Sequence, residues 1–357
     1  MKANKLFLTL LTALCLPAAF TSCEKLFVEP DPEGTPTQSF EYLWHQVDEK
    51  YAFFDIKNVD WQQVYNTYRP MVSDDINDDS LFNVMASMLS LLDDGHTNLT
   101  TPFDRSYSDS VYRKMYRRKN VDDRVVWLNY LHLADDRMHT TGGFHHHALR
   151  GGKIGYWVYG SFTSQVDSAT LTHLTRRYAD ADGLVIDMRQ NGGGAVAYLK
   201  EMLKLLPNHG QPLYLTQIKS GPGHDEFTTI QEFCAPKKSS SYCYRKPIVI
   251  LTDRGSYSAT SFFALCCLEY DNVTLVGDTT GGGLGLPNGG QLPNGWTYRF
   301  SISRNLTLDG KNYENGVPPD HVVMLDPAAT AAGKDNVIEY ACDLIESQAS
   351  LAAASRK

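Results

Sequence analysis

Apolar residues recur at helical spacing in the first part of the chain. The first stripe consists of Phe40, Leu43, Trp44, Val47 and Tyr51, which fall three or four residues apart on one helix face. The same period predicts two further helices, over 61–68 and 80–92. Stripes of this kind are normally buried against one another. We therefore expect a small N-terminal helical domain over 39–100.

From residue 151 onward, short apolar runs alternate with helical stretches, which is typical of an α/β fold. The runs that predict strands are 153–159, 183–187, 248–251 and 300–306. The stretches that predict helices are 166–178, 195–206, a segment that begins at Ala259, and 335–348. Segment 101–150 holds a basic cluster and a β-like run over 125–131. We expect a connecting segment over 101–150 and an α/β core over 151–357.

The first residues predict a signal peptide. Lys2 and Lys5 precede an apolar run over 6–20 that is too short to span a membrane, and Thr-Ser leads into Cys23. This ending resembles a bacterial lipoprotein cleavage site, so residues 1–22 are expected to be removed and Cys23 to carry a lipid. Plain secretion, with Cys23 removed or free, is the alternative. Residues 23–38 contain several Pro and one Gly and predict a flexible tether. The expected location is the cell envelope, on a membrane and facing the periplasm or the surface.

The composition is that of an ordinary globular protein and does not indicate a nucleic-acid partner. The 357 residues are 42% hydrophobic and 21% charged, with a formal net charge of -8, which is ordinary for a globular protein. No basic patch stands out, so nucleic acid is not expected as a partner. Cys234 and Cys243 flank a polar loop and allow a disulfide outside the cytoplasm. Cysteines 266, 267 and 342 lie in helical stretches, where buried, inert thiols are expected.

Metal and cofactor sites are not expected. Residues 145–147 are three consecutive histidines, but consecutive strand residues alternate between faces and cannot all converge on one ion. Gly192, Gly194 and Ala197 fit a loose dinucleotide pattern, yet no acidic residue ends the next strand, near 217–219. The loop 281–283 lacks the Lys-Ser/Thr of a P-loop. The prediction is therefore a protein without a cofactor.

Ser258 lies where a buried strand turns into a helix. The strand over 248–251 ends at the turn Asp253-Arg254-Gly255, and the helical pattern starts at Ala259. Free amides at a helix N-terminus favour developing negative charge, so Ser258 with the amide of Ala259 suits a nucleophile. The simpler interpretation of this segment alone is that Ser258 caps the helix. The strand, glycine loop and helix around 191–194 also form anion-binding geometry.

Five segments together resemble the tail-specific, or C-terminal processing, serine peptidases, which include the tricorn core. In family order, they are LDDGHT (92–97), VIDMRQNGGG (185–194), SATS (258–261), VGDTTG (276–281) and ENGVPPD (314–320). The resemblance covers the chain from about residue 40 to its end. It implies an α/β fold, with a crotonase-like ββα core and twisted sheet, and a small N-terminal helical domain.

The resemblance also implies roles for individual residues. Ser258 would be the nucleophile, and the amides of Ala259 and a glycine, Gly193 in preference to Gly194, would form the oxyanion hole. Many family members use a lysine base after the Gly-Asp pair, but 279–283 contains none. The sequence instead resembles the tricorn-type branch, in which His96 would be the base and Glu314 would orient it. Segment 101–150 is short for the PDZ domain that many members insert, so none is expected.

Two hypotheses of different classes follow. The first is a secreted, lipid-anchored serine endopeptidase that cleaves peptides or unfolded proteins through an acyl-enzyme. The second is a non-catalytic relative that binds a peptide or an apolar ligand in the same cleft. The combination of Ser258, His96 and Glu314 favours the enzyme. An unrelated esterase is a weaker option, because segment 256–260 lacks the Gly-x-Ser-x-Gly pattern.

Overall fold

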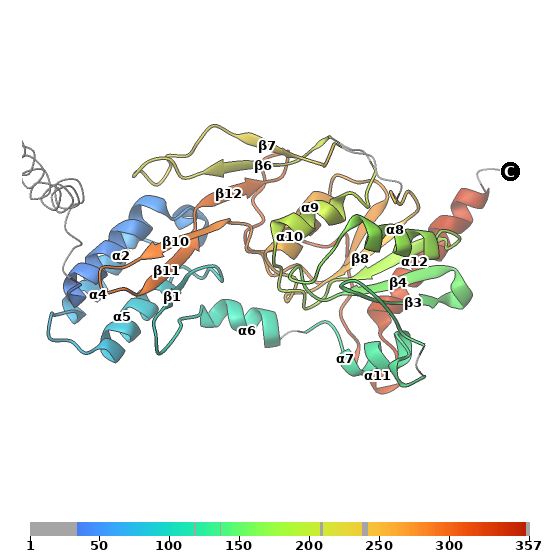
Figure 1. Cartoon of the computed structure of the whole chain (residues 1–357), viewed down its shortest axis with the longest axis horizontal. Coiled ribbons are helices and arrows are strands. Elements are labelled where there is room, and N and C mark those ends of the chain that lie inside the picture. The colour runs from blue at the N-terminus through green and yellow to red at the C-terminus, as the bar shows by residue number, and fades with distance from the viewer. Residues whose placement is uncertain (1–33, 118, 136, 208–209, 238–241, 355–357) are drawn as a thin grey trace, which may run out of the picture.

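The computed structural model describes residues 34–117, 119–135, 137–207, 210–237 and 242–354 (Figure 1). The expected signal peptide, Cys23 and most of the expected tether lie outside these residues. Helices α2, α4 and α5 gather at one end of the molecule, and a large sheet with its covering helices forms the other end (Figure 1). Within the described residues, no helix is both long enough and apolar enough to cross a membrane.

The three predicted N-terminal helices are confirmed. They are α2 (Pro36–Lys50), α4 (Trp61–Tyr68) and α5 (Asp78–Ser90), with the short α3 (Phe54–Lys57) between the first two and a 3-10 turn (Arg69–Met71) after the second. Helix α2 begins inside the expected tether, which is a correction to the boundary at residue 38. The cause is local: the Thr35 side chain accepts a hydrogen bond from the amide of Gln38, and Pro36 occupies the first helical position.

A hairpin inserted in the α/β core, about two hundred residues later in the sequence, completes this helical region. Strands β10 (Pro287–Gln291) and β11 (Thr297–Ser301) form a three-stranded antiparallel sheet with β1 (Asn98–Thr100). Trp296, Tyr298 and Phe300 are buried in the same apolar cluster as the helix stripes. The segment just before β1 is thereby fixed against strands that lie between β9 (Val273–Gly277) and β13 (His321–Val322) of the α/β core in sequence.

The large sheet has seven strands in the order β13-β9-β8-β5-β4-β3-β2. The pairs from β4 to β13 are parallel, and β2, β3 and β4 pair in antiparallel fashion. Its strands are β2 (His139–Thr141), β3 (Phe144–Leu149), β4 (Ile154–Tyr159), β5 (Gly183–Asp187), β8 (Ile248–Thr252), β9 (Val273–Gly277) and β13 (His321–Val322). The predicted strands at β4, β5 and β8 are confirmed. The sheet begins before residue 151, because β3 pairs with β4 along its whole length.

Helices cover both faces of this sheet. Helices α8 (Ser168–Arg177), α9 (Val196–Leu203) and α10 (Ala259–Cys267) share one apolar cluster with alternate strand residues such as Ile186 and Ile250. Helix α12 (Asn336–Ala354) packs on the other face, against Val185 and Val249. The four predicted helices of the core are therefore confirmed. A short helix, α11 (Pro327–Ala331), precedes α12.

A separate three-stranded sheet has the order β12-β6-β7 and contains β6 (Pro212–Ile218), β7 (Gln231–Cys234) and β12 (Ser303–Leu306). The single strand expected over 300–306 is thus divided. β11 ends at Ser301 and β12 begins at Ser303, so the chain leaves one sheet and enters another at Ile302.

The strand expected over 125–131 is wrong. The chain there forms α7 (Asp123–Val125) and a π-helical turn (Val126–Tyr130). The Asp122 carboxylate accepts a hydrogen bond from the amide of Val125 and starts the helix. Tyr130 and its apolar neighbours then pack against the cluster beneath α12. The rest of segment 101–150 holds α6 (Asp109–Arg117) and the 3-10 turn Leu133–Asp135, and another 3-10 turn, Arg150–Gly152, follows β3.

The histidines and cysteines singled out in the sequence have simple environments. Of the three consecutive histidines on β3, His146 is buried and its ring nitrogens lie 2.9 Å from Thr141 Oγ1 and 2.8 Å from Tyr178 Oη. Within the described residues, no group of three or more His, Cys, Asp or Glu side chains is arranged to hold a metal ion. Cys234 and Cys243 are both free thiols, and helical cysteines 266, 267 and 342 are buried.

Candidate active site

Ser258 sits on a strained turn between β8 and α10. Its backbone has φ 55° and ψ -119°, a combination that costs of order 1–3 kcal/mol for a residue with a side chain. The Ser258 hydroxyl makes no capping bond to α10, so the interpretation of Ser258 as a helix cap is wrong. Instead, its Oγ lies 3.0 Å from Nε2 of His96, a residue 162 positions earlier in the chain.

Two glycine-containing loops hold this turn in place. The amide of Ser258 donates to the carbonyl of Gly282 at 2.9 Å, and the amide of Tyr257 donates to the carbonyl of Asn191 at 3.0 Å. Ser256 is fully buried, and its hydroxyl donates to the carbonyl of Met188 at 2.8 Å. The two serines therefore have different surroundings: the Ser256 hydroxyl is buried and bonded to the backbone, whereas the Ser258 hydroxyl faces His96.

Gly193 lies directly behind the serine turn. A Cβ atom at this position would be 2.6 Å from the carbonyl oxygen of Tyr257 and 2.9 Å from Ser258 Cβ, and its φ of +93° also disfavours a side chain. Only glycine fits here without displacing the backbone that carries Ser258.

The amides near Ser258 differ in their availability to bind an oxyanion. The amide of Gly193 donates to Asn191 Oδ1 at 3.0 Å, so it is already engaged. For Gly194 and Ala259, no acceptor lies within hydrogen-bond reach of the backbone amide in the described part of the chain. Gly194, Ala259 and Ser258 all line one cleft. Gly194 is therefore the freer of the two expected glycine donors.

His96 is held in the turn between α5 and β1. Its own amide donates to Asp94 Oδ1 at 2.8 Å, and its carbonyl accepts from Arg299 Nε at 3.2 Å. The ring is buried and its centroid lies 5.2 Å from that of the Tyr257 ring. Burial lowers the pKa of His96, and the Asp94 carboxylate opposes this shift. At neutral pH, the imidazole is therefore uncharged and able to accept a proton from Ser258.

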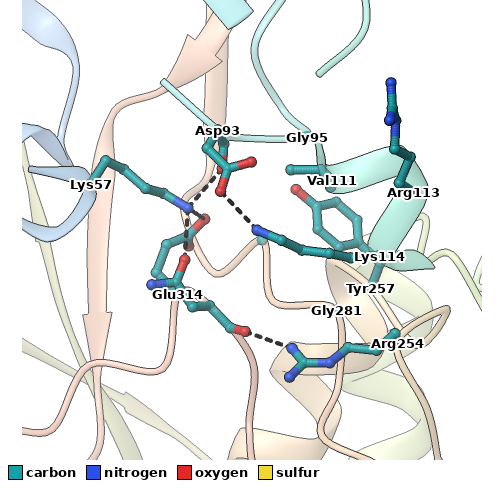
Figure 2. A pocket seen from close by; sticks show the side chains of 12 residues that line it. Lys57, Asp93, Gly95, Val111, Arg113, Lys114, Arg254, Tyr257, Gly281 and Glu314 are labelled. Carbon is teal, nitrogen blue, oxygen red and sulfur yellow. Dashed lines mark hydrogen bonds and ion pairs between the residues drawn. The ribbon is translucent and has the colours of Figure 1, made fainter. Parts of the chain in front are cut away.

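Glu314 is also buried, but no hydrogen bond or ion pair links it to His96 among the residues described. Its Oε2 accepts from the amide of Leu284 at 2.7 Å, and its Oε1 lies 4.0 Å from Lys57 Nζ (Figure 2). Burial raises the pKa of Glu314 to about 8; nearby Asp94 adds to the shift and Lys57 opposes it. The orienting role expected for Glu314 stays a prediction.

Tyr257 stands beside both groups. Its ring contacts His96. Burial raises the pKa of its phenol well above 10, and nearby Asp94 and Glu314 add to the shift. No role was predicted from the sequence for Tyr257, Asp94 or Arg299. A signal for two of them was present, because Asp94 belongs to the LDDGHT segment and Tyr257 precedes the candidate nucleophile.

The cleft at Ser258 has a volume of about 570 Å³. Val111 and Met115 of α6 line it on one side, with Phe262 of α10 and Leu286 elsewhere on its wall. Among the described residues that line it, Arg299 is the one Arg or Lys side chain. The arrangement places a serine hydroxyl, a neutral imidazole and free backbone amides around a partly apolar cleft, which suits attack on a carbonyl group.

The chain is similar to known peptidases in sequence and in structure. The model of peptidase family S41 matches residues 153–323, and that of the tricorn protease C1 domain matches residues 32–90. A candidate peptidase of known structure from Parabacteroides merdae is 34% identical, and the match covers 87% of this chain and 96% of that one, with a TM-score of 0.81.

More distant proteins also match. The carboxy-terminal processing protease CtpB of Bacillus subtilis (strain 168) is 26% identical over 189 residues, which is 52% of this chain and 37% of CtpB. The chain thus matches well under half of the length of this relative. The structure of mature CPAF has a TM-score of 0.61 at 14% identity, and the match covers 88% of this chain and 98% of that one. That likeness concerns the fold alone.

Proposed function

This chain belongs to peptidase family S41, and from that premise we propose that it is a serine endopeptidase with Ser258 as its nucleophile and His96 as its general base. The observation that carries the proposal is the 3.0 Å approach of His96 Nε2 to the uncapped hydroxyl of Ser258. The substrate is a peptide or an unfolded protein. No cofactor is needed for this chemistry.

The reaction proceeds in two halves. Ser258 Oγ attacks the carbonyl carbon of the scissile bond while its proton passes to His96 Nε2. The oxyanion that forms accepts hydrogen bonds from the amides of Ala259 and Gly194. The imidazolium then gives its proton to the leaving amine, which leaves an acyl-enzyme on Ser258. A water molecule then attacks the ester while His96 takes its proton; the imidazolium returns that proton to Ser258 Oγ, and the carboxylic acid product leaves.

Two buried carboxyl groups act on the imidazolium. Asp94 is tied to the His96 backbone through its 2.8 Å hydrogen bond, and its negative charge favours the protonated ring. Glu314 is buried beside Lys57 and contributes through space when it is ionised. Engagement of the Gly193 amide by Asn191 is the reason for assigning the second oxyanion donor to Gly194.

The proposed enzyme works at a membrane outside the cytoplasm. Support comes from the sequence alone: Lys2 and Lys5, the apolar run over 6–20, and Cys23 after Thr-Ser. A lipid on Cys23 would hold the protein on the membrane of the cell envelope, with the segment before α2 as spacer. Several acyl chains on one cysteine would anchor it firmly, whereas a single chain binds only marginally.

A fluorophosphonate probe tests the nucleophile directly. Its phosphorus reacts with an activated serine, and the adduct oxygen occupies the oxyanion hole. We expect the label to map to Ser258 by peptide mass spectrometry and to vanish in Ser258→Ala and His96→Ala. Buried Ser256, two residues earlier, serves as the internal control and should carry no label. Folded wild type that neither takes the label nor hydrolyses peptides would favour a ligand-binding relative instead.

A further inference from the structure

Figure 2 shows a second cavity, of about 510 Å³. It lies next to the catalytic cleft. The two cavities share Gly95, Val111 and Tyr257 as lining residues. Four basic side chains line the second cavity: Lys57, Arg113, Lys114 and Arg254. The whole chain has a formal net charge of -8, so this gathering of positive charge is not a general property of the protein.

Lys114, Arg113 and Arg254 keep donors available to the cavity. Lys114 Nζ lies 2.9 Å from Asp93 Oδ2, which is an acidic group on the cavity wall. Arg113 pairs with Asp109, and Arg254 Nε lies 3.9 Å from Asp278 Oδ2; neither of these aspartates lines the cavity. Arg254 Nη1 also donates to the carbonyls of Thr280 at 3.2 Å and Asn315 at 3.0 Å. A guanidinium has five N–H donors, so these contacts still leave part of each guanidinium unused.

The remaining lining groups do not oppose an anion. Glu314 also faces this cavity, but burial raises its pKa to about 8, so most of it is uncharged at neutral pH. Lys57 Nζ donates to the carbonyl of Asp93 at 2.9 Å and to Asn315 Oδ1 at 2.8 Å, and its charge faces Glu314. The balance of charge on the wall is therefore positive.

Tyr257 supplies an independent sign that a ligand belongs here. It is only 7% exposed, and its Oη makes no hydrogen bond of regular geometry with the described residues, although the backbone of Gly95 lies beside it. A buried hydroxyl without a regular partner is costly. Because Tyr257 lines both cavities, a polar group that enters the second cavity beside Ser258 could satisfy this hydroxyl.

We propose that this cavity is a carboxylate subsite, in which Arg113, Lys114 and Arg254 bind an acidic group of the peptide whose scissile bond lies at Ser258. The peptidase would accordingly prefer peptides that carry a carboxylate at a fixed distance from the scissile bond. This inference rests on the proposed function, because it assigns the cleft beside the cavity to a peptide. The carboxylate has two possible sources, an Asp or Glu side chain and a free C-terminus.

Matched peptides distinguish these sources. The first series consists of quenched fluorescent peptides that carry Asp or Glu at successive distances from a cleavable apolar residue. Each is compared with the same peptide carrying Asn or Gln at that position. A second series compares a free C-terminal carboxylate with an amide at the same distances. We expect the carboxylate to lower KM by about three- to tenfold at one favoured distance, with little change in kcat. Two or three partly exposed charge contacts are enough to produce a preference of this size. The series that shows the effect identifies the source.

Arg113→Gln/Lys114→Gln removes two charges from α6, where glutamine is a good helix former. We expect this variant to lose most of the preference and its salt dependence, and to cleave the neutral peptide with wild-type kcat and KM. Arg124→Gln/Lys153→Gln, which removes two exposed charges elsewhere, is the matched control and should keep the preference. Circular dichroism checks that both variants are folded.

Binding measurements separate this inference from the proposed function. Fluorescence anisotropy of the same peptides on Ser258→Ala needs no catalysis and should show the same preference for the carboxylate. Equal binding and equal cleavage of the acidic and neutral peptides would overturn the subsite but leave the peptidase intact. A carboxylate preference in binding, without cleavage or labelling of the wild type, would support the subsite and overturn the catalytic assignment.

Discussion

Replacing Glu314 by glutamine removes one buried ionisable group while keeping an acceptor for the amide of Leu284. The carboxyl group has a pKa of about 8 in the folded protein, against an ordinary value of 4.5. The folded state therefore holds this proton more tightly than the unfolded chain does. As pH rises from 4.5 to 8, the unfolded state releases the proton first, and the folded state loses stability relative to it.

The size of this effect follows from the same two pKa values. A one-proton difference changes the free energy of unfolding by about 1.4 kcal/mol per pH unit, so the loss attributable to Glu314 is on the order of 5 kcal/mol by pH 9. Glu314→Gln should remove it. Urea unfolding of both proteins at pH 5, 7 and 9 should show the variant gaining stability relative to wild type as pH rises.

Activity should report the same titration. Only about a tenth of Glu314 is ionised at pH 7 if its pKa is near 8. If the ionised form supports the His96 imidazolium, wild-type kcat/KM should rise with pH in two steps. The first step, below pH 6.5, reflects deprotonation of His96, whose pKa is lowered. The second, near pH 8, reflects ionisation of Glu314. Glu314→Gln should keep the His96 step and lose the upper one, with about 10²-fold lower kcat at pH 9.

Two results would refute this reasoning. A constant difference in unfolding free energy between wild type and variant from pH 5 to 9 would mean that Glu314 is not protonated in the folded protein. A variant with an unchanged profile and rate would mean that Glu314 does not act on His96, which would leave Asp94 as the carboxylate that supports the ring.

Two further predictions concern the serine turn and the N-terminus. Gly193→Ala would place a Cβ atom 2.6 Å from the carbonyl of Tyr257, so we expect it to abolish fluorophosphonate labelling, whereas Gly192→Ala, where a Cβ atom meets nothing within 4 Å, should retain it. Labelling of Gly193→Ala at the wild-type rate would contradict the proposed packing. Mass spectrometry of the mature protein should find a lipid-modified Cys23 at the N-terminus, and an unmodified N-terminus at another residue would exclude lipid anchoring.

Strong periodicity explains why most elements could be predicted. The helix over 61–68 and the strand over 183–187 have the same bounds in the structure, because each is a run of one clear period that ends at a turn or a cap. The run over 125–131 failed for the opposite reason. Its β-branched residues favour a strand, but the Asp122 cap and packing beneath α12 outweigh that local preference.

The candidate site was only partly predictable. The pairing of His96 with Ser258 came from the family resemblance, since no local pattern connects residues that are 162 positions apart. The state of the Gly193 amide could not be foreseen, because it depends on the rotamer of Asn191. The same holds for Glu314, whose neighbours Leu284 and Lys57 come from distant parts of the chain.

The way in which the two ends of the molecule interlock explains how such distant residues meet. His96 immediately precedes the segment that enters β1, and β1 pairs with β11, which follows the serine turn by about forty residues in the sequence. Arg299 of β11 then binds the carbonyl of His96. The base is thus fixed to strands that continue from the nucleophile's own domain, so the catalytic distance depends on the β1–β11 register. The N-terminal helices serve catalysis indirectly, because their apolar faces bury the other side of this hairpin and hold that register in place.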